Sequence, residues 1–189
     1  MLVSDVVDVV LRKLGRKGGR VVAGRLIRPP RNGSVVVIEF PDNHALQIEE
    51  NSGHVYFPDI HIVHDPVANW LREEAMSQME SALAAHPHID LVYAHNDPMA
   101  AGAFLAAKAK GRENEMKFVG IDALPGLDGG IQMVADGRLA ATFVYPTGGK
   151  EAVEIADKIL RGEQVPHKIV LDTAMVTKDN VAQFQKPAK

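Results

Sequence analysis

The sequence contains no cysteine among its 189 residues. Disulfide bonds are therefore excluded, and so is every reaction or metal site that needs a thiolate. The absence does not identify the compartment, because a chain without cysteine is compatible with reducing and oxidising surroundings alike. Aromatic residues are also scarce, at 5% of the chain, and Trp70 is the single tryptophan.

Long apolar runs and clusters of basic charge are lacking as well. No stretch approaches the ~20 apolar residues that a membrane span needs. The net charge is -3 and no basic helix is present, so nucleic acid is not an expected partner. The N-terminus does not fit a secretory signal, because Asp5 and Asp8 interrupt its apolar positions and its basic residues follow them.

The motifs of common catalytic and metal sites are absent too. The sequence has no H-E-x-x-H or G-x-S-x-G pattern, and the "TGGK" of residues 147–150 lacks the upstream glycine of a P-loop. His54, His61 and His64 lie close together, but no second cluster with ligand spacing accompanies them. We therefore expect no enzymatic activity, no metal and no cofactor.

From residue 58 onward, predicted strands alternate with predicted helices. The strands are continuous apolar runs, which is typical of a mostly parallel sheet that helices cover on both faces. The predicted fold is a three-layer α/β sandwich with a doubly wound sheet. The expected strands are 59–65, 89–95, 117–122, 139–145 and 168–173, and the expected helices are 67–85, 98–110, 128–136, 148–161 and 178–184.

The first 57 residues are less regular. A helix over 4–14 and a buried strand over 35–40 are predicted, but the pattern between them and up to residue 57 is weak. We interpret residues 1–57 as an irregular N-terminal part, either remnant or rearranged, and residues 58–189 as one lobe. Together they have the length of one compact domain.

Polar and aromatic side chains stand where four predicted strands give way to helices. These residues are Trp70, Asn96, Asp122 and Tyr145. In a doubly wound sheet the ligand crevice lies beyond the carboxyl ends of the strands, so the four are expected to share one edge. Asp97 is a natural N-cap and Pro98 a natural first helical residue, which leaves Asn96 without a local structural role.

The chemistry of these four side chains suits a carbohydrate. A carboxylate accepts hydrogen bonds from neighbouring hydroxyls, an amide donates and accepts, and a flat aromatic ring packs on the C–H face of a sugar. Each residue also has a plainer interpretation. Asn96 and Asp122 can be turn or cap residues, Tyr145 an interior aromatic, and Trp70 a residue of helix packing. The case rests on their repetition at equivalent junctions.

Several segments resemble the C-terminal half of the type 1 periplasmic sugar-binding proteins, the ribose, galactose and arabinose class that serves ABC transporters. The similar segments are "VYAHNDPMAAGA", "FVGIDALP", "DGRLAATFVYPTGGKEAVEIADKILRGE" and "IVLDTAMVTKDNV". They lie in register over residues 58–184, and the resemblance weakens before residue 58. It implies a lobe of the type 1 periplasmic-binding fold, with a second lobe that closes on the sugar.

The resemblance also implies roles for individual residues. Asn96, Asp122 and Tyr145 would contact sugar hydroxyls, and Trp70 would stack on the ring. Gln47 stands where the family normally carries a sugar-binding arginine, which is a departure from the pattern.

The implied function is non-catalytic recognition of a monosaccharide by the lobe of a periplasmic solute-binding protein for an ABC permease. One alternative is a sugar-sensing lobe of a receptor kinase or a transcription regulator. Another is an orphan lobe that forms a homodimer, or pairs with a missing N-terminal lobe, without a ligand.

Overall fold

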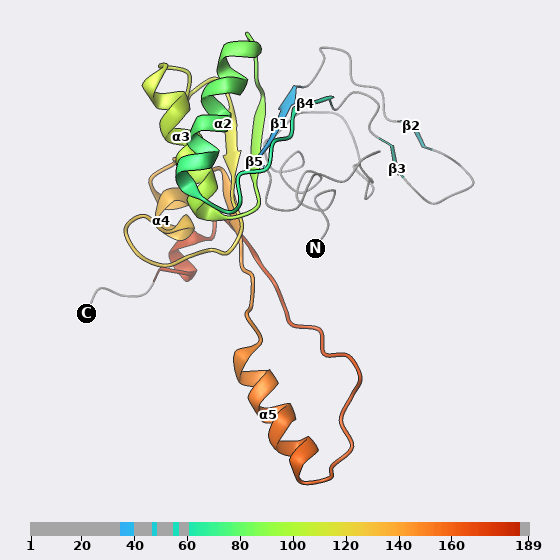
Figure 1. Cartoon of the computed structure of the whole chain (residues 1–189). Coiled ribbons are helices and arrows are strands. Elements are labelled where there is room, and N and C mark those ends of the chain that lie inside the picture. Colours follow the sequence, from blue (N-terminus) through green and yellow to red (C-terminus); the bar gives the residue numbers. More distant parts are fainter. Residues whose placement is uncertain (1–34, 40–46, 49–54, 57–60, 186–189) are drawn as a thin grey trace.

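The computed structural model describes residues 35–39, 47–48, 55–56 and 61–185 (Figure 1). Their strands are β1 (Val35–Glu39), β2 (Gln47–Ile48), β3 (Val55–Tyr56), β4 (His61–His64), β5 (Leu91–Ala94), β6 (Lys117–Val119), β7 (Ala141–Phe143) and β8 (Met175–Thr177). The helices are α2 (Arg72–Ala85), α3 (Asp97–Ala109), α4 (Gly130–Ala135), α5 (Gly149–Leu160) and the 3₁₀ helix η1 (Val181–Gln183). The helix predicted over 4–14 lies outside the described residues.

One six-stranded sheet organises the fold, in the order β4-β1-β5-β6-β7-β8. Strands β5, β6 and β7 pair in parallel, while β1 is antiparallel to both β4 and β5, and β8 is antiparallel to β7. It follows that β4, β5, β6 and β7 all run in one direction. The predicted α/β class with a mostly parallel sheet is confirmed, and the predicted strand over 35–40 is β1.

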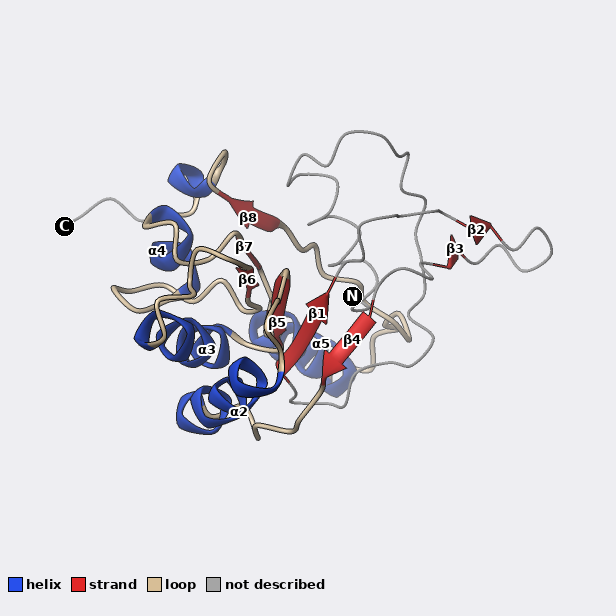
Figure 2. Cartoon of the chain, turned by 90° about the horizontal axis from the view of Figure 1, so that it is seen from above, coloured by secondary structure: helices blue, strands red, loops and turns tan. Residues whose placement is uncertain are grey.

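Helices α2, α3 and α4 lie on the same face of this sheet (Figure 2). The chain moves across the sheet in one direction from β4 to β7, and right-handed crossovers then place each connecting helix on the same side. Side chains of these three helices share one buried core with residues of β5, β6 and β8, such as Val92, Phe118 and Val176. The second helical layer expected from residue 58 onward is not seen among the described residues, where α2, α3 and α4 pack on the sheet and α5 (Gly149–Leu160) has no buried residue.

The contact between α2 and α3 depends on small residues. Ala100, Ala103 and Ala107 of α3 are buried. A Cβ at Gly102 would stand 2.2 Å from the carbonyl oxygen of Arg72, so α3 approaches the first turn of α2 at a distance that only glycine allows. The alanine-rich sequence of α3 is thus the basis of a close helix–helix packing.

Three predicted elements differ from the structure. Helix α2 begins at Arg72 rather than at 67, because Asn69 and Trp70 have positive φ angles of 45° and 58° and cannot continue a helix. The last strand is β8 at 175–177, and the segment predicted as a strand over 168–173 is a connection in which Val170 is 75% exposed. The terminal helix is the single 3₁₀ turn η1.

Helix α5 stands away from the rest of the lobe (Figure 1). Its bounds match the prediction over 148–161, but none of its residues is buried. The apolar face formed by Ala152, Ile155, Ala156, Ile159 and Leu160 therefore does not pack on the sheet. Among the described residues, the segment that returns from α5 lies beside this face, and Pro166, Ile169 and Leu171 of that segment line a cavity of about 330 Å³ together with Ala152 and Ile155.

Candidate ligand-binding site

The carboxyl ends of four strands meet at one edge of the sheet, and each predicted site residue from the lobe follows one of them. Trp70 follows β4, Asn96 follows β5, Asp122 follows β6 and Tyr145 follows β7. Because these strands run in the same direction, the four junctions face the same way. We refer to Trp70, Asn96, Asp122 and Tyr145 as the rim.

Hydrogen bonds connect each rim junction to the next. The Asn96 amide Nδ2 donates to the carbonyl oxygen of Trp70 at 3.1 Å. The backbone amide that follows Asn96 donates to Ile121 O at 2.8 Å, directly before Asp122. The backbone amide of Asp122 donates to Phe143 O at 2.9 Å, and Asp122 forms a parallel bridge with Val144, the neighbour of Tyr145. The structure therefore brings the four residues together in the order Trp70, Asn96, Asp122, Tyr145.

Asn96, and not Asp97, caps helix α3. Asn96 has extended backbone angles, and its Oδ1 accepts a hydrogen bond from the backbone amide of Met99 at 2.8 Å. The prediction that Asp97 is the N-cap and that Asn96 has no local role is wrong, because α3 begins one residue earlier than predicted. After these two bonds the Asn96 amide retains one N–H and one oxygen lone pair for a ligand.

Two rim junctions hold strained backbone. In the part of the chain that the structure describes, the non-glycine residues with positive φ are Asn69, Trp70, Asp122 and Ala123. Such conformations cost about 1–3 kcal/mol each, and they persist where the surrounding structure requires them. Both pairs lie at the junctions that carry Trp70 and Asp122, so this strained backbone sets the direction in which these two side chains leave the chain.

The rim side chains remain accessible. Trp70 is 47% exposed and Tyr145 is 66% exposed, although both are large aromatic residues. Asp122 is partly buried, and this burial raises the pKa of its carboxyl above the ordinary value. The edge thus offers an indole face, an amide, a carboxylate and a phenol, none of which is consumed by core packing.

Gln47, the fifth predicted contact, is placed on β2. Among the described strands, β2 pairs with β3 alone, in a two-stranded sheet separate from the one that carries the rim. Figures 1 and 2 both show β2 apart from the main sheet. The described contacts do not bring Gln47 to the rim, and its role stays a prediction.

The sequence interpretation missed Thr142, a fully buried polar residue of β7 that bonds to Asp97. A threonine inside the apolar run "LAATFVY" was the available signal. A buried hydroxyl needs a partner, and that partner had to be sought among the polar residues of neighbouring junctions.

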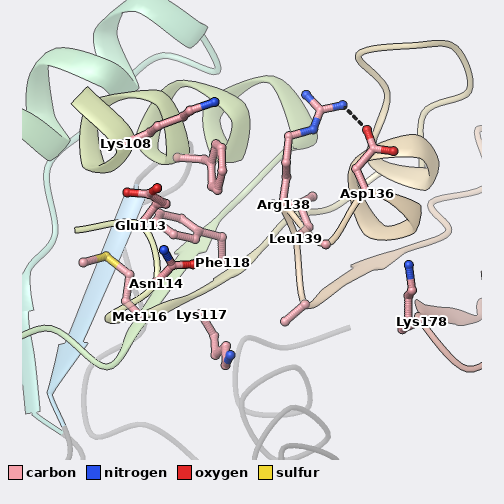
Figure 3. Close-up of a pocket in the computed structure, with 13 residues that line it drawn as sticks. Lys108, Glu113, Asn114, Met116, Lys117, Phe118, Asp136, Arg138, Leu139 and Lys178 are labelled. Carbon is pink, nitrogen blue, oxygen red and sulfur yellow. Dashed lines mark hydrogen bonds and ion pairs between the residues drawn. The ribbon is translucent and has the colours of Figure 1, made fainter. Parts of the chain in front are cut away.

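A cavity of about 490 Å³ lies at the opposite edge of the sheet (Figure 3). Its lining includes Lys117 at the start of β6, Ala140 just before β7, and Lys108 near the end of α3. Arg138, also in the lining, is held by Asp136 at 2.9 Å. Because this cavity is at the amino ends of β6 and β7, it is separate from the rim.

The described residues show neither a cluster of metal ligands nor a membrane-spanning helix. Within 61–185 and the short strands described before them, no three metal-ligating side chains gather in one place. The helices of that part of the chain are also too short or too polar to cross a membrane.

Comparison with known proteins identifies the family. A family model for the periplasmic binding protein domain matches residues 4–164. The chain belongs to the periplasmic binding protein domain family. The match begins at residue 4, so it includes the N-terminal part in which the resemblance of individual segments was weak.

Individual members of the periplasmic binding protein family extend this result. The ribose import binding protein of Salmonella typhimurium is 39% identical over 113 residues, which cover 59% of this chain and 37% of that protein. The putative rhizopine-binding protein of Rhizobium meliloti is 39% identical over 129 residues, 67% of this chain and 41% of that protein.

Two solved structures of periplasmic binding proteins share the fold. The fructose-binding periplasmic domain of a hybrid two-component system has a TM-score of 0.66 and 48% identity, over 68% of this chain and 43% of that one. An ABC transporter solute-binding protein from Actinobacillus succinogenes with bound D-allose has a TM-score of 0.61 and 31% identity, over 67% of this chain and 45% of that one. The chain thus spans less than half the length of these relatives.

Proposed function

We propose that this chain is the sugar-binding lobe of a periplasmic binding protein and recognises a monosaccharide without catalysis. The observation that carries the proposal is the rim, where hydrogen-bonded junctions bring Trp70, Asn96, Asp122 and Tyr145 to one edge. Relatives named for ribose and fructose, and one holding D-allose, support a sugar as the ligand class.

The chemistry of the rim explains why a sugar is the best match. The Asp122 carboxylate accepts hydrogen bonds from two vicinal hydroxyls, and the remaining N–H and lone pair of Asn96 pair with a third. Trp70 supplies the flat apolar surface for the C–H face of the ring. Tyr145, in the remaining position, can donate to or accept from a further hydroxyl.

The ligand also needs a second surface. Trp70 is 47% exposed and Tyr145 is 66% exposed, so a sugar held at the rim keeps much of its surface in water unless another part of the protein covers it. Tight binding of small ligands depends on burial of most of their surface. We infer that a second lobe covers the sugar, and that the exposed apolar face of α5 packs against this lobe or against a second copy of the chain.

Delivery of the sugar to an ABC permease is the first candidate for the physiological role, since several relatives are import binding proteins. Sensing through a kinase is the second, favoured by 48% identity to the fructose-binding domain of a hybrid two-component system. Both roles place the lobe in the periplasm, where these families of binding proteins act.

A thermal-shift panel of pentoses, hexoses and polyols tests the proposal. A ligand stabilises the folded chain by RT ln(1 + [L]/Kd), so millimolar affinity is visible at high sugar concentration. We expect at least one sugar to raise the Tm of the wild-type chain, and its effect to weaken in Asp122→Asn. Asp128→Asn is the matched control, because Asp128 is an exposed carboxylate in the same β6–α4 connection that pairs with Arg138 at 3.6 Å.

The outcomes separate the alternatives. A sugar that stabilises wild type and Asp128→Asn but not Asp122→Asn supports the rim as the site. An unchanged effect in Asp122→Asn contradicts the assignment of the rim. No effect of any sugar contradicts sugar binding by this chain, and its mass in solution then shows whether it self-associates instead.

A further inference from the structure

The carboxylate of Asp97 is a buried connection between three rim junctions. Asp97 is fully buried at the start of α3. Its Oδ1 accepts a hydrogen bond from the Thr142 hydroxyl at 2.6 Å, and its Oδ2 accepts one from the backbone amide of Leu124 at 2.8 Å. Its own backbone amide donates to Ile121 O. One residue thus joins the start of α3, the connection after β6 and strand β7.

Thr142 extends this connection by one further bond. Its Oγ1 accepts a hydrogen bond from the backbone amide of Ala123 at 3.1 Å while it donates to Asp97. The two side chains therefore hold the amides of Ala123 and Leu124, the residues that directly follow Asp122. Because Asp122 and Ala123 both have positive φ, this strained turn needs such external bonds to persist.

The surrounding backbone leaves room for the carboxylate and for little else. A Cβ on Gly120 would stand 2.4 Å from Asp97 Oδ1, and a Cβ on Gly130 would stand 2.1 Å from Oδ2. The donors that reach the carboxylate are a hydroxyl and backbone amides, including that of Gly130, and the charge of Asp122 lies nearby. Glycine at both positions is thus what makes space for Asp97.

This arrangement costs stability. Burial, reinforced by the charge of Asp122, raises the pKa of Asp97 to about 6, since the hydrogen bonds only partly offset the loss of hydration. An apolar residue of similar size would avoid the burial of charge, but it would leave the Leu124 amide and the Thr142 hydroxyl without this acceptor. In natural proteins, costly features such as a buried carboxylate concentrate at sites where function requires them.

We propose that Asp97 is a positioning residue that fixes Asp122 relative to Asn96 without touching the ligand. The proposal rests on the proposed function, because its purpose is the geometry of the sugar-binding rim. Asp97 acts through its two ends: its backbone continues from Asn96, and its carboxylate, with Thr142, sets the turn that presents Asp122. Its full burial excludes direct contact with a ligand.

The test compares Asp97→Asn, Thr142→Val and the control Asp128→Asn in the full chain. Amide hydrogen exchange and the NMR signals of the Asn96 side-chain amide are measured without ligand, and affinity for the stabilising sugar is measured by calorimetry. In Asp97→Asn we expect the Ala123 and Leu124 amides to exchange about tenfold faster and the Asn96 amide signals to shift. Amides of Met79 and Ala82 in α2 should keep their wild-type exchange.

Thr142→Val should accelerate Ala123 more than Leu124, because only Ala123 bonds directly to the hydroxyl. Sugar affinity should fall about tenfold in Asp97→Asn with no change in Asp128→Asn. Unchanged exchange at 123 and 124, or equal acceleration throughout the chain, overturns the proposal, as does wild-type affinity in a folded Asp97→Asn chain. If Asp97→Asn does not fold, Thr142→Val decides by the same measurements. If no sugar binds wild type, the proposed function fails while the exchange data still judge the connection itself.

Discussion

Asn96 and Trp70 are 26 positions apart in the sequence, and Nδ2 of Asn96 donates a hydrogen bond to the carbonyl oxygen of Trp70 at 3.1 Å. The other end of the same amide caps α3 through the backbone amide of Met99. One side chain therefore ties the strained Trp70 junction to the start of the next helix. Substitution of Asn96 therefore changes stability as well as ligand contact, and a binding experiment alone does not distinguish the two effects.

Substitutions at Asn96 should separate capping from ligand contact. Asn96→Ala loses the N-cap and the bond to Trp70, so we expect the free energy of unfolding to fall by about 1 kcal/mol or more. Asn96→Asp keeps a good N-cap but has no N–H to donate, so most stability should remain while sugar affinity falls. Urea unfolding followed by circular dichroism measures the first effect. Equal losses of stability in the two variants would contradict the capping role.

The fluorescence of Trp70 should report ligand binding directly. Trp70 is the single tryptophan of the chain, and it is 47% exposed at the rim. A sugar stacked on the indole should shift its emission to shorter wavelength and protect it from quenching by acrylamide, because the ring leaves water. The change should saturate with the same affinity that calorimetry gives. Emission that stays constant while a sugar binds would exclude Trp70 from the site.

A methyl group at Gly102 should damage the packing of α2 on α3. The new Cβ would lie 2.2 Å from Arg72 O, and neither backbone can yield easily. We expect Gly102→Ala to destabilise the chain by about 1–3 kcal/mol, although alanine favours a helix interior. Gly149→Ala is the control, because its Cβ would meet nothing nearer than Thr147 Oγ1 at 3.9 Å. Chemical denaturation compares the two, and a similar stability for both would show that the α2–α3 contact is looser than the structure shows.

The buried carboxyl of Asp97 should make stability depend on pH. Its pKa of about 6 in the folded chain exceeds the ordinary value of 3.8, so the folded state binds the proton more tightly than the unfolded chain does. The resulting stabilisation is complete below about pH 4 and is lost as the pH rises through 6. The difference between Asp97→Asn and wild type in free energy of unfolding should therefore shift in favour of the variant by on the order of 3 kcal/mol between about pH 4 and pH 7.

Urea titrations of both proteins across this pH range measure the effect. Titrating groups away from Asp97, such as Glu115, whose pKa Arg112 lowers, cancel in the difference because both proteins contain them. Parallel stability curves would show that Asp97 has an ordinary pKa in the folded chain.

The strand–helix alternation after residue 58 could be predicted from sequence because apolar runs and helical spacing are local signals. The common edge of Trp70, Asn96, Asp122 and Tyr145 followed from one rule about the carboxyl ends of parallel strands. The start of α2 could not be predicted, because the positive φ angles of Asn69 and Trp70 arise from tertiary context. The residue types at 69 and 70 do not require such angles.

Other errors have the same origin. Asn96 and Asp97 are equally good N-caps by residue type. The buried partners of Asp97, which include Thr142, 45 positions away, hold its carboxylate inside the lobe and leave the cap to Asn96. Residues 168–173 have the composition of a strand, but Ile169 and Val170 are largely exposed in the segment that returns from α5. Branched apolar residues such as Ile169 and Val170 occur both in strands and on exposed surfaces that bind a partner, so composition alone does not distinguish the two.

Helix α5 has a thermodynamic consequence of its own. Helices of fewer than about 12–15 residues are marginal in water, and α5, Gly149–Leu160, has no buried residue to stabilise it. The stability of α5 should therefore be coupled to the binding of the surface that covers Ile155 and Ile159. In the chain by itself we expect unfolding and proteolysis to begin in α5, while β5 and α3 remain intact. The rate at which a protease first cuts between residues 149 and 160 would thus measure the fraction of chains whose α5 is not covered by a second lobe or a second copy.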